Sequence, residues 1–247
     1  MQHVIGSEPD GHTLIVGTAS PIVVAPQAMK SVKFDPLTDL TAVNMLSFTS
    51  IAIGVHPSIE ARTIGELAEL SRKKPITMAL PLVGSVSHLV TEMVAKATGC
   101  NFLNVPYTGG GPALNDTIGG HVNSTVSDMG VLIPQHQAGK LRIVFLSADK
   151  RVDGLPDVQV ASEVKPELEV KSWIGMFAHG KTPKPIIEKI NAAVVSSLAS
   201  DAVRAQYKIL SATPNAMASP DAFQKFVVGE HARFGAILRE RGIVING

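Results

Sequence analysis

Cysteine is almost absent from this 247-residue sequence, in which Cys100 is the only one. A single cysteine excludes an intramolecular disulfide and a metal site built from several cysteines. Aromatic residues make up only 4% of the chain, and no apolar run approaches the roughly 18 residues of a membrane span. We therefore expect no direct membrane insertion. The first residues, from Met1 to Val4, also lack the basic start and apolar run of a signal peptide.

An excess of either charge is missing as well, since 22 basic residues face 21 acidic ones and give a net charge of +1. Neither sign forms a long run, so the sequence does not support a nucleic-acid partner. The histidines are scattered, without a pair at metal-ligand spacing beside a third ligand, and we expect no metal site.

The residues that are abundant indicate an α/β protein. Hydrophobic residues make up 45% of the chain, and 21 glycines and 16 prolines suit many short connections. Short apolar runs alternate with segments of helical periodicity, and this order is typical of a doubly wound parallel sheet. The expected strands are residues 12–17, 76–80, 102–105, 122–126 and 141–147, and the expected helices include 63–74, 87–98, 131–138, 185–199 and one that begins at Ser219-Pro220.

Two local patterns are more specific. Thr63 and Glu66 have the spacing of a capping box at the start of the first helix, which Pro75 ends. The segment Leu40–Val55 is apolar but interrupted by Asn44, Ser47 and Ser50, and we interpret it as two strand pieces.

The loop Gly84-Ser85-Val86-Ser87-His88 follows an expected strand. A serine at a strand-to-helix turn suggests a hydrolase, with Ser85 or Ser87 acting beside His88. However, His88 occupies the position of the second glycine of a nucleophile elbow. Small residues before a helix also let free N–H groups approach an anion, and this second interpretation is the better one.

The loop Gly109-Gly110-Gly111 follows the next expected strand. Leu114 stands where the dinucleotide fingerprint requires its third glycine, so we expect no nucleotide cofactor. The glycines fit either a tight turn with positive φ or a close approach to a ligand. Asp128, at the end of a further strand, fits either a ligand hydroxyl or loop N–H groups as hydrogen-bond donors.

A series of short motifs follows one another in a distinctive order over nearly the whole chain. The motifs are Asp10-Gly11-His12-Thr13-Leu14, Phe34-Asp35-Pro36, Val105-Pro106-Tyr107-Thr108-Gly109-Gly110, Pro112-Ala113-Leu114, Gly119-Gly120-His121-Val122, Ala138-Gly139-Lys140-Leu141-Arg142, Leu155-Pro156-Asp157-Val158, Ser172-Trp173-Ile174-Gly175-Met176-Phe177-Ala178 and Thr182-Pro183-Lys184-Pro185. Together they resemble the tripartite tricarboxylate transporter substrate-binding proteins, also called the Bug family.

That resemblance implies a periplasmic-binding-protein fold of the type II-like, Venus flytrap kind, with a mostly parallel sheet flanked by helices in each of two domains. Domain one would comprise residues 1–75 and 177–247, and domain two residues 76–173. The resemblance further implies a periplasmic protein that is no enzyme, has no cofactor and captures a small carboxylate. Membrane transporter subunits would be its partners.

The resemblance also implies a ligand-binding set taken from the matching loops. These residues are Gly17, Thr18, Ala19, Gly84, Ser85, Ser87, His88, Tyr107, Thr108, Gly109 and Asp128.

Two departures from the family pattern qualify these expectations. Pro81-Leu82-Val83 replaces smaller and more polar residues, which predicts a drier pocket and a more apolar ligand than a citrate-like acid. The family's first strand and its Pro-Phe-x-x-Gly-Gly loop have no counterpart before Gln2, so domain one is expected to be incomplete. A ligand-sensing remnant without a transport role is therefore a third alternative.

Overall fold

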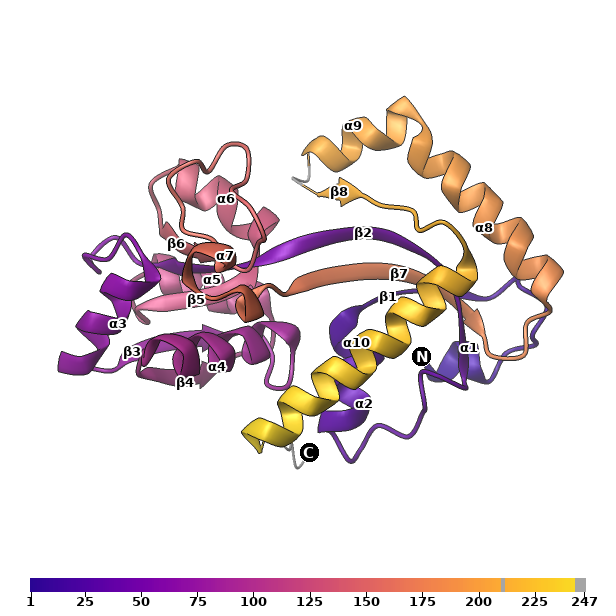
Figure 1. The fold of residues 1–247 in the computed structure, drawn as a ribbon, viewed down its shortest axis with the longest axis horizontal. Coiled ribbons are helices and arrows are strands. Elements are labelled where there is room, and N and C mark those ends of the chain that lie inside the picture. Colours follow the sequence, from indigo (N-terminus) through magenta and orange to yellow (C-terminus); the bar gives the residue numbers. More distant parts are fainter. Residues whose placement is uncertain (210–211, 243–247) are drawn as a thin grey trace. The chain divides into compact units, whose positions relative to one another are not determined.

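A computed structural model describes residues 1–209 and 212–242 (Figure 1). It divides into unit 1, Met1–Phe48 with Trp173–Gly247, and unit 2, Thr49–Ser172. The units differ from the predicted domains chiefly in residues 49–75, which belong to unit 2. The reason is strand pairing, because the end of β2 (Leu40–Val55) pairs with strands of unit 2 from Ile51 onwards.

Unit 2 alternates strands and helices, as the sequence predicts. After the second part of β2 its elements are α3 (Ile64–Lys73), β3 (Ile76–Leu80), α4 (Val86–Thr98), β4 (Phe102–Pro106), α5 (Gly110–Ile118), β5 (Ser124–Asp128), α6 (Met129–Gln137), β6 (Arg142–Leu146), α7 (Ala161–Val164) and a 3-10 turn (Pro166–Leu168).

The unit 2 sheet combines parallel and antiparallel pairs. β3 lies between β4 and β5 and is parallel to both, whereas β2 is antiparallel to β5 and to β6. The carboxyl ends of β3, β4 and β5 therefore meet at one edge of the sheet. In open α/β sheets this edge is where ligands bind.

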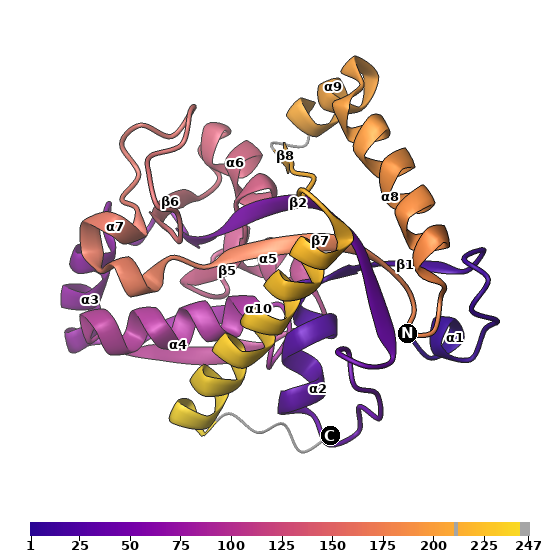
Figure 2. The same cartoon turned by 45° about the vertical axis from the view of Figure 1, so that its right-hand side comes forward.

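Helix caps explain where the helices of unit 2 begin and end. The Thr63 hydroxyl accepts a hydrogen bond from the Glu66 amide at the start of α3, as predicted, but the Glu66 carboxylate returns to the amide of Arg62. Gly99 ends α4 with a φ of 73°, a conformation that favours glycine. α3 and α4 are in contact (Figures 1 and 2).

Unit 1 contains both ends of the described chain. Its elements are α1 (Gln2–Ile5), β1 (Leu14–Thr18), a π-helical turn (Ser20–Val24), α2 (Ala25–Ala28), the first part of β2, most of β7 (Lys171–His179), α8 (Lys184–Ala199), α9 (Asp201–Ile209), β8 (Thr213–Pro214) and α10 (Pro220–Arg241). The α/β class is confirmed, but β1–β7 and β2–β8 are antiparallel rather than parallel.

β2 is one strand of 16 residues, so the prediction of two strand pieces was wrong. Asn44 is fully buried, and its side-chain amide donates to Asn191 and to the carbonyl of Met217. Ser47 is also buried, where it bonds Tyr207. These polar residues do not interrupt the strand because distant segments satisfy their hydrogen bonds.

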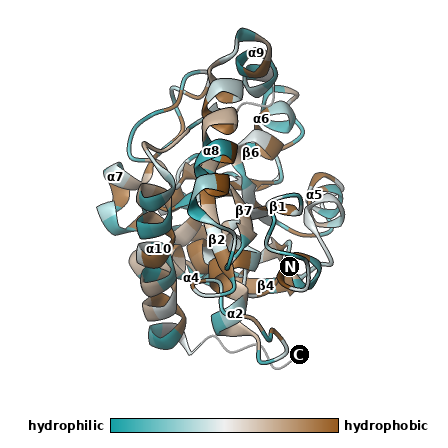
Figure 3. Ribbon diagram, turned by 90° about the vertical axis from the view of Figure 1, so that its right-hand side faces the viewer, coloured by the Kyte–Doolittle hydropathy of each residue, from teal (hydrophilic) through white to brown (hydrophobic). Residues whose placement is uncertain are grey.

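The core of unit 1 is an aromatic cluster between β7 and α10. Trp173 is fully buried, and its ring meets that of Phe223 edge-on, with 5.8 Å between centroids. Hydrophilic and hydrophobic residues alternate along α8 and α10 (Figure 3), as expected of helices with one buried face.

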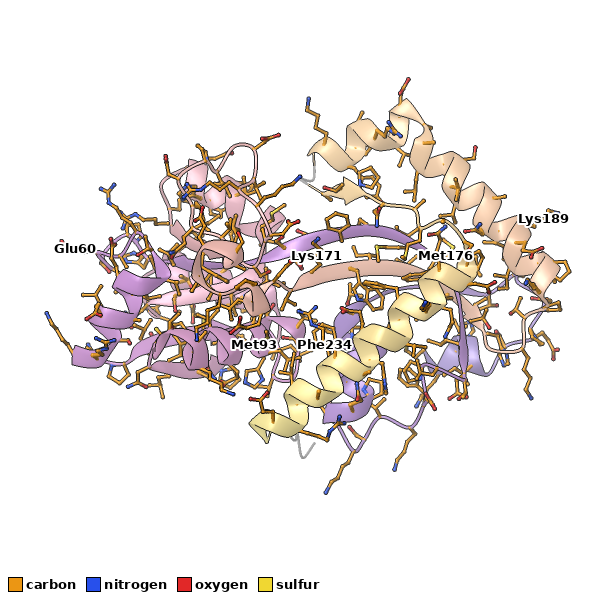
Figure 4. All side chains as sticks on the ribbon, in the orientation of Figure 1. Glu60, Met93, Lys171, Met176, Lys189 and Phe234 are labelled. Atoms are coloured by element: carbon orange, nitrogen blue, oxygen red, sulfur yellow. The ribbon has the colours of Figure 1, made fainter. Side chains whose placement is uncertain are left out.

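Figure 4 labels Phe234 on α10, which is fully buried, and Met176 on β7, which packs against the apolar face of α8. Lys189, labelled on α8, is exposed. In the described part of the chain, the helices are too short or too polar to cross a membrane.

Candidate functional site

Eight of the eleven predicted site residues belong to unit 2, and all eight follow or end β3, β4 or β5. The parallel pairing of these strands brings their three loops to the same edge of the sheet. Gly84, Ser85, Ser87 and His88 follow β3, Tyr107, Thr108 and Gly109 follow β4, and Asp128 ends β5.

The loop after β3 is held by its own hydrogen bonds. Gly84 has a φ of 75°, which favours glycine. The hydroxyl of Ser85 donates to the carbonyl of Leu82 over 2.7 Å and accepts from the amide of His88 over 3.3 Å, so that Ser85 caps α4. Both Gly84 and Ser85 are buried, whereas Ser87 is half-buried. The loop is therefore a fixed scaffold.

Both ring nitrogens of His88 have a neighbour, one in this loop and one on α4. Its Nδ1 accepts a hydrogen bond from the Gly84 amide over 3.1 Å, which places the proton of the neutral ring on Nε2. Nε2 lies 3.6 Å from the Glu92 carboxylate, and Glu92 in turn accepts from the Asn104 amide. These contacts make His88 a residue that positions the loop. Its direct contact with a ligand stays a prediction.

The Ser–His hydrogen bond of a hydrolase is not formed by these residues. The Ser85 hydroxyl bonds backbone groups, and the imidazole of His88 bonds Gly84 and faces Glu92. A serine nucleophile requires a base within hydrogen-bond reach of its hydroxyl. The described residues of this loop therefore do not have the geometry of that enzyme.

Tyr107 is half-buried after β4, and its hydroxyl donates to Asp116 over 2.7 Å. This hydrogen bond is the main reason why the pKa of Tyr107 rises to about 12. Thr108, the next residue, is exposed. Tyr107 therefore remains a neutral hydrogen-bond donor that fixes the start of the glycine loop.

Neither backbone conformation nor packing requires glycine at positions 109, 110 and 111. Gly109 is extended, and Gly109, Gly110 and Gly111 are all outside the left-handed region, so the positive-φ interpretation was wrong. A Cβ atom added at any of the three would meet no heavy atom within 4 Å. Their lack of side chains leaves the backbone of this loop open to approach.

Two helices start at this edge without a side-chain cap. α5 begins after Gly109, and α6 begins after Asp128, whose side chain makes no capping hydrogen bond. The first N–H groups of a helix have no partner within the helix and carry partial positive charge. Together the two helix starts make this edge favourable for an anion.

Asp128 combines burial with an unpaired oxygen. Its Oδ1 atom is buried and has no hydrogen-bond partner among the described residues. Burial raises the pKa of this carboxyl, and a hydrogen bond with Ser172 partly opposes the rise. The alternative prediction, that Asp128 binds loop N–H groups, is not supported at the start of α6, where its side chain makes no capping hydrogen bond. A buried acceptor without a partner is costly unless a ligand or water supplies a donor.

The other three predicted residues, Gly17, Thr18 and Ala19, belong to unit 1. A Cβ atom at Gly17 would come within 2.9 Å of Ile22, so packing accounts for this glycine. Ala19 is fully buried, and Thr18 is exposed at the end of β1. Their contact with a ligand stays a prediction.

Several supporting residues were missed by sequence reasoning. Glu92 lies four residues after His88 on a predicted helix, so helical spacing alone could have identified the pair. Asp116 and Ser172 gave no such signal, because their contacts with Tyr107 and Asp128 depend on the folded loops.

Residues 1–243 match the family model described as the tripartite tricarboxylate transporter family receptor. The chain is also similar to the protein BugT of Bordetella pertussis, with 29% identity over 240 residues that cover 96% of this chain and 73% of BugT. An Agrobacterium vitis protein is 27% identical over 249 residues, which cover 97% of this chain and 70% of that protein.

Solved structures agree with this match. An R. palustris protein with adipate is 28% identical, has a TM-score of 0.89, and is matched over 98% of this chain and 82% of its own. The protein MatC of Rhodopseudomonas palustris with bound malate is 27% identical, has a TM-score of 0.84, and is matched over 96% and 82%. The α/β periplasmic-binding-protein fold is therefore confirmed, and the chain belongs to the tripartite tricarboxylate transporter receptor family, whose members are binding proteins rather than enzymes.

Proposed function

We propose that this protein binds a small carboxylate at the carboxyl edge of the unit 2 sheet and delivers it, in the periplasm, to the membrane subunits of a tripartite transporter. The observation that supports this function is the meeting of two uncapped helix starts, an open glycine loop and the unpaired Oδ1 of Asp128 at one edge. Similar proteins with adipate and with malate support the carboxylate class.

Each part of the edge has a separate role in this proposal. The N–H groups at the start of α5 and α6 donate to the ligand carboxylate, directly or through ordered water. The glycines at 109–111 allow the backbone to come close. Asp128 accepts a hydrogen bond from a hydroxyl group of the ligand, so that its buried oxygen is no longer unpaired.

The ligand's carbon skeleton is expected to be apolar. Leu82 in the loop after β3 is 52% exposed, and Val131 in the first turn of α6 is 44% exposed. Covering these apolar side chains with a ligand favours binding by about 25 cal/mol for each Å² of apolar surface removed from water. An acid with fewer carboxylates and a more apolar skeleton than citrate therefore fits this edge better than citrate does.

Calorimetric titration of the 247-residue chain tests this function. The panel contains malate and succinate, which differ by one hydroxyl, together with adipate, citrate and 1,6-hexanediol, which has the adipate skeleton without its carboxylates. We expect the acids to bind, malate more tightly than succinate, and the diol to give no heat of binding. Micromolar affinity corresponds to about 8 kcal/mol. Equal binding of adipate and the diol, or binding of no acid, would contradict the proposal.

A further inference from the structure

Unit 1 contains a pocket of about 430 Å³ that is separate from the predicted site residues. It is lined by the start of β2, the first two turns of α8 and the start of α10, and we call it the α8–α10 pocket. Figure 1 labels these three elements. Its volume falls within the range of about 300–1,000 Å³ that small-molecule sites occupy. The pocket is thus large enough for a small metabolite.

The first indication of a ligand is Thr182, which lines this pocket. Thr182 is 7% exposed, and its hydroxyl oxygen is buried without a hydrogen-bond partner among the described residues. Its backbone amide donates a hydrogen bond to the carbonyl of His179. A buried hydroxyl without a partner lowers stability, so the fold gains nothing from it unless a further molecule binds there.

Two side-chain amides in the same lining use their oxygens for hydrogen bonds within the fold. Oε1 of Gln224 accepts from the backbone amide of Ala42 over 3.1 Å, and Oδ1 of Asn191 accepts from the side chain of Asn44. The NH₂ groups of Gln224 and Asn191 thus remain as donors in the pocket lining. Two neutral N–H donors beside the buried Thr182 hydroxyl favour a carboxylate.

The rim of the pocket carries charges of both signs. Nζ of Lys184 lies 4.0 Å from a carboxylate oxygen of Glu188 and 3.9 Å from one of Asp221, and all three side chains are largely exposed. One cation therefore faces two anions, which leaves one negative charge in excess. This excess negative charge repels a ligand that is only an anion, but it attracts a ligand that also carries a cationic group.

From these features we infer that the α8–α10 pocket binds a small zwitterion of the amino-acid type. Its carboxylate accepts hydrogen bonds from Thr182, Asn191 and Gln224. Its ammonium group faces Glu188 and Asp221 at the rim. This site is independent of the carboxylate site proposed in unit 2, because no lining residue is shared between them.

Backbone amide NMR of the whole chain, with three matched probes, tests the inference. The probes are L-2-aminobutyrate, butyrate, which lacks the ammonium group, and propylammonium, which lacks the carboxylate. We expect only L-2-aminobutyrate to shift the amides of Thr182, Lys184 and Gln224 in a saturable manner. Equal shifts with butyrate, or no saturable shift with any probe, would overturn the proposal.

Two substitutions separate binding from folding. Gln224→Glu keeps an oxygen for the Ala42 amide but replaces the NH₂ donor by an anion, and it should weaken L-2-aminobutyrate binding at least about tenfold. Gln206→Glu, the same change at an exposed position of α9, is the matched control and should bind normally. Unchanged affinity in Gln224→Glu would overturn the proposal.

Thr182→Val provides an independent second variant, because it removes the unpaired hydroxyl and keeps the shape of the side chain. The variant should melt at the same or a higher temperature than the parent, yet bind L-2-aminobutyrate at least about threefold more weakly. Normal affinity in this variant would contradict a role for the hydroxyl. Carboxylate binding in unit 2 is read separately, from the amides of Gly84 and Asp128, so failure of one site is distinguishable from failure of the other.

Discussion

The loop after β3 and the end of β5 border the same edge of the unit 2 sheet, but their polar groups have different partners. In the loop, Ser85 and His88 bond backbone atoms of the loop itself. At the end of β5, Asp128 has a buried oxygen without a partner in the described chain. Satisfied polar groups maintain a loop, whereas an unsatisfied one gains most from a ligand. This contrast separates scaffold from candidate contact.

The largest expected effect comes from Asp128→Asn. The substitution replaces the carboxylate that would accept a hydrogen bond from a ligand hydroxyl by a neutral amide. We expect malate affinity to fall about tenfold or more, because a hydrogen bond to a charged group is stronger than one to a neutral group. Succinate, which has no hydroxyl, should lose little. Calorimetric titration with both acids measures the difference. Equal losses for malate and succinate would show that Asp128 does not distinguish the hydroxyl.

The stability of the same variant provides a control that needs no ligand. Burial raises the pKa of Asp128, so the folded state holds the proton more tightly than the unfolded chain does. The ionised group therefore destabilises the fold above the raised pKa, and this effect disappears below its ordinary value of 3.8, where both states are protonated. Urea unfolding should show a stabilising effect of Asp128→Asn at neutral pH that vanishes in acid.

The next effect concerns the scaffold loop. Gly84 has a φ of 75° and is buried, so Gly84→Ala should lower the free energy of unfolding by about 1–2 kcal/mol. Gly99→Ala, at a φ of 73° in open space, has the same backbone strain and is the matched control. Thermal unfolding measures both. A similar loss in the two variants, with acid binding reduced only in Gly84→Ala, would confirm that the β3 loop supports the site.

The glycines after β4 should respond in the opposite direction. Gly110 and Gly111 are in the first turn of α5, with open space where a Cβ atom would stand. Replacing both by alanine should raise the free energy of unfolding by up to about 1 kcal/mol per site, because the unfolded chain loses freedom. Carboxylate affinity should fall, since the methyl groups obstruct approach to the backbone. Higher stability with unchanged affinity would exclude these glycines from the site.

Local signals predicted the elements of unit 2 well, but they could not show which polar groups have partners. Thr63 caps α3 and Gly99 ends α4, as spacing and residue type indicate. Asn44 interrupts the apolar pattern of β2 in the sequence, yet its partner Asn191 lies 147 residues away, so its satisfied burial was not predictable. For the same reason the sequence left the role of Asp128 open: its unpaired oxygen is a property of the folded loops.

The smallest expected effect is that of Tyr107→Phe. Tyr107 belongs with the scaffold, because its hydroxyl is paired with Asp116 over 2.7 Å. The group is half-buried, so we expect the loss of this hydrogen bond to cost only about 0.5–1 kcal/mol at neutral pH. Acid binding should fall slightly, since the hydrogen bond fixes the start of the glycine loop, while direct contact of Tyr107 with the ligand stays a prediction.

The ionisation of Tyr107 supplies the decisive measurement, made with Tyr207→Phe as the parent protein because burial also raises the pKa of Tyr207, the other of the two tyrosines. The bond to Asp116 raises the pKa of Tyr107 from 10.0 to about 12 by stabilising the protonated phenol. The contribution of this hydrogen bond to the free energy of unfolding is therefore complete below about pH 10 and is lost as the pH rises toward 12. Absorbance titration should show the high-pKa transition in Asp116→Asn shifted toward the ordinary value, because the carboxylate is gone. A Tyr107 that titrates normally in the parent protein would place this side chain outside the scaffold and return it to the group of open ligand contacts.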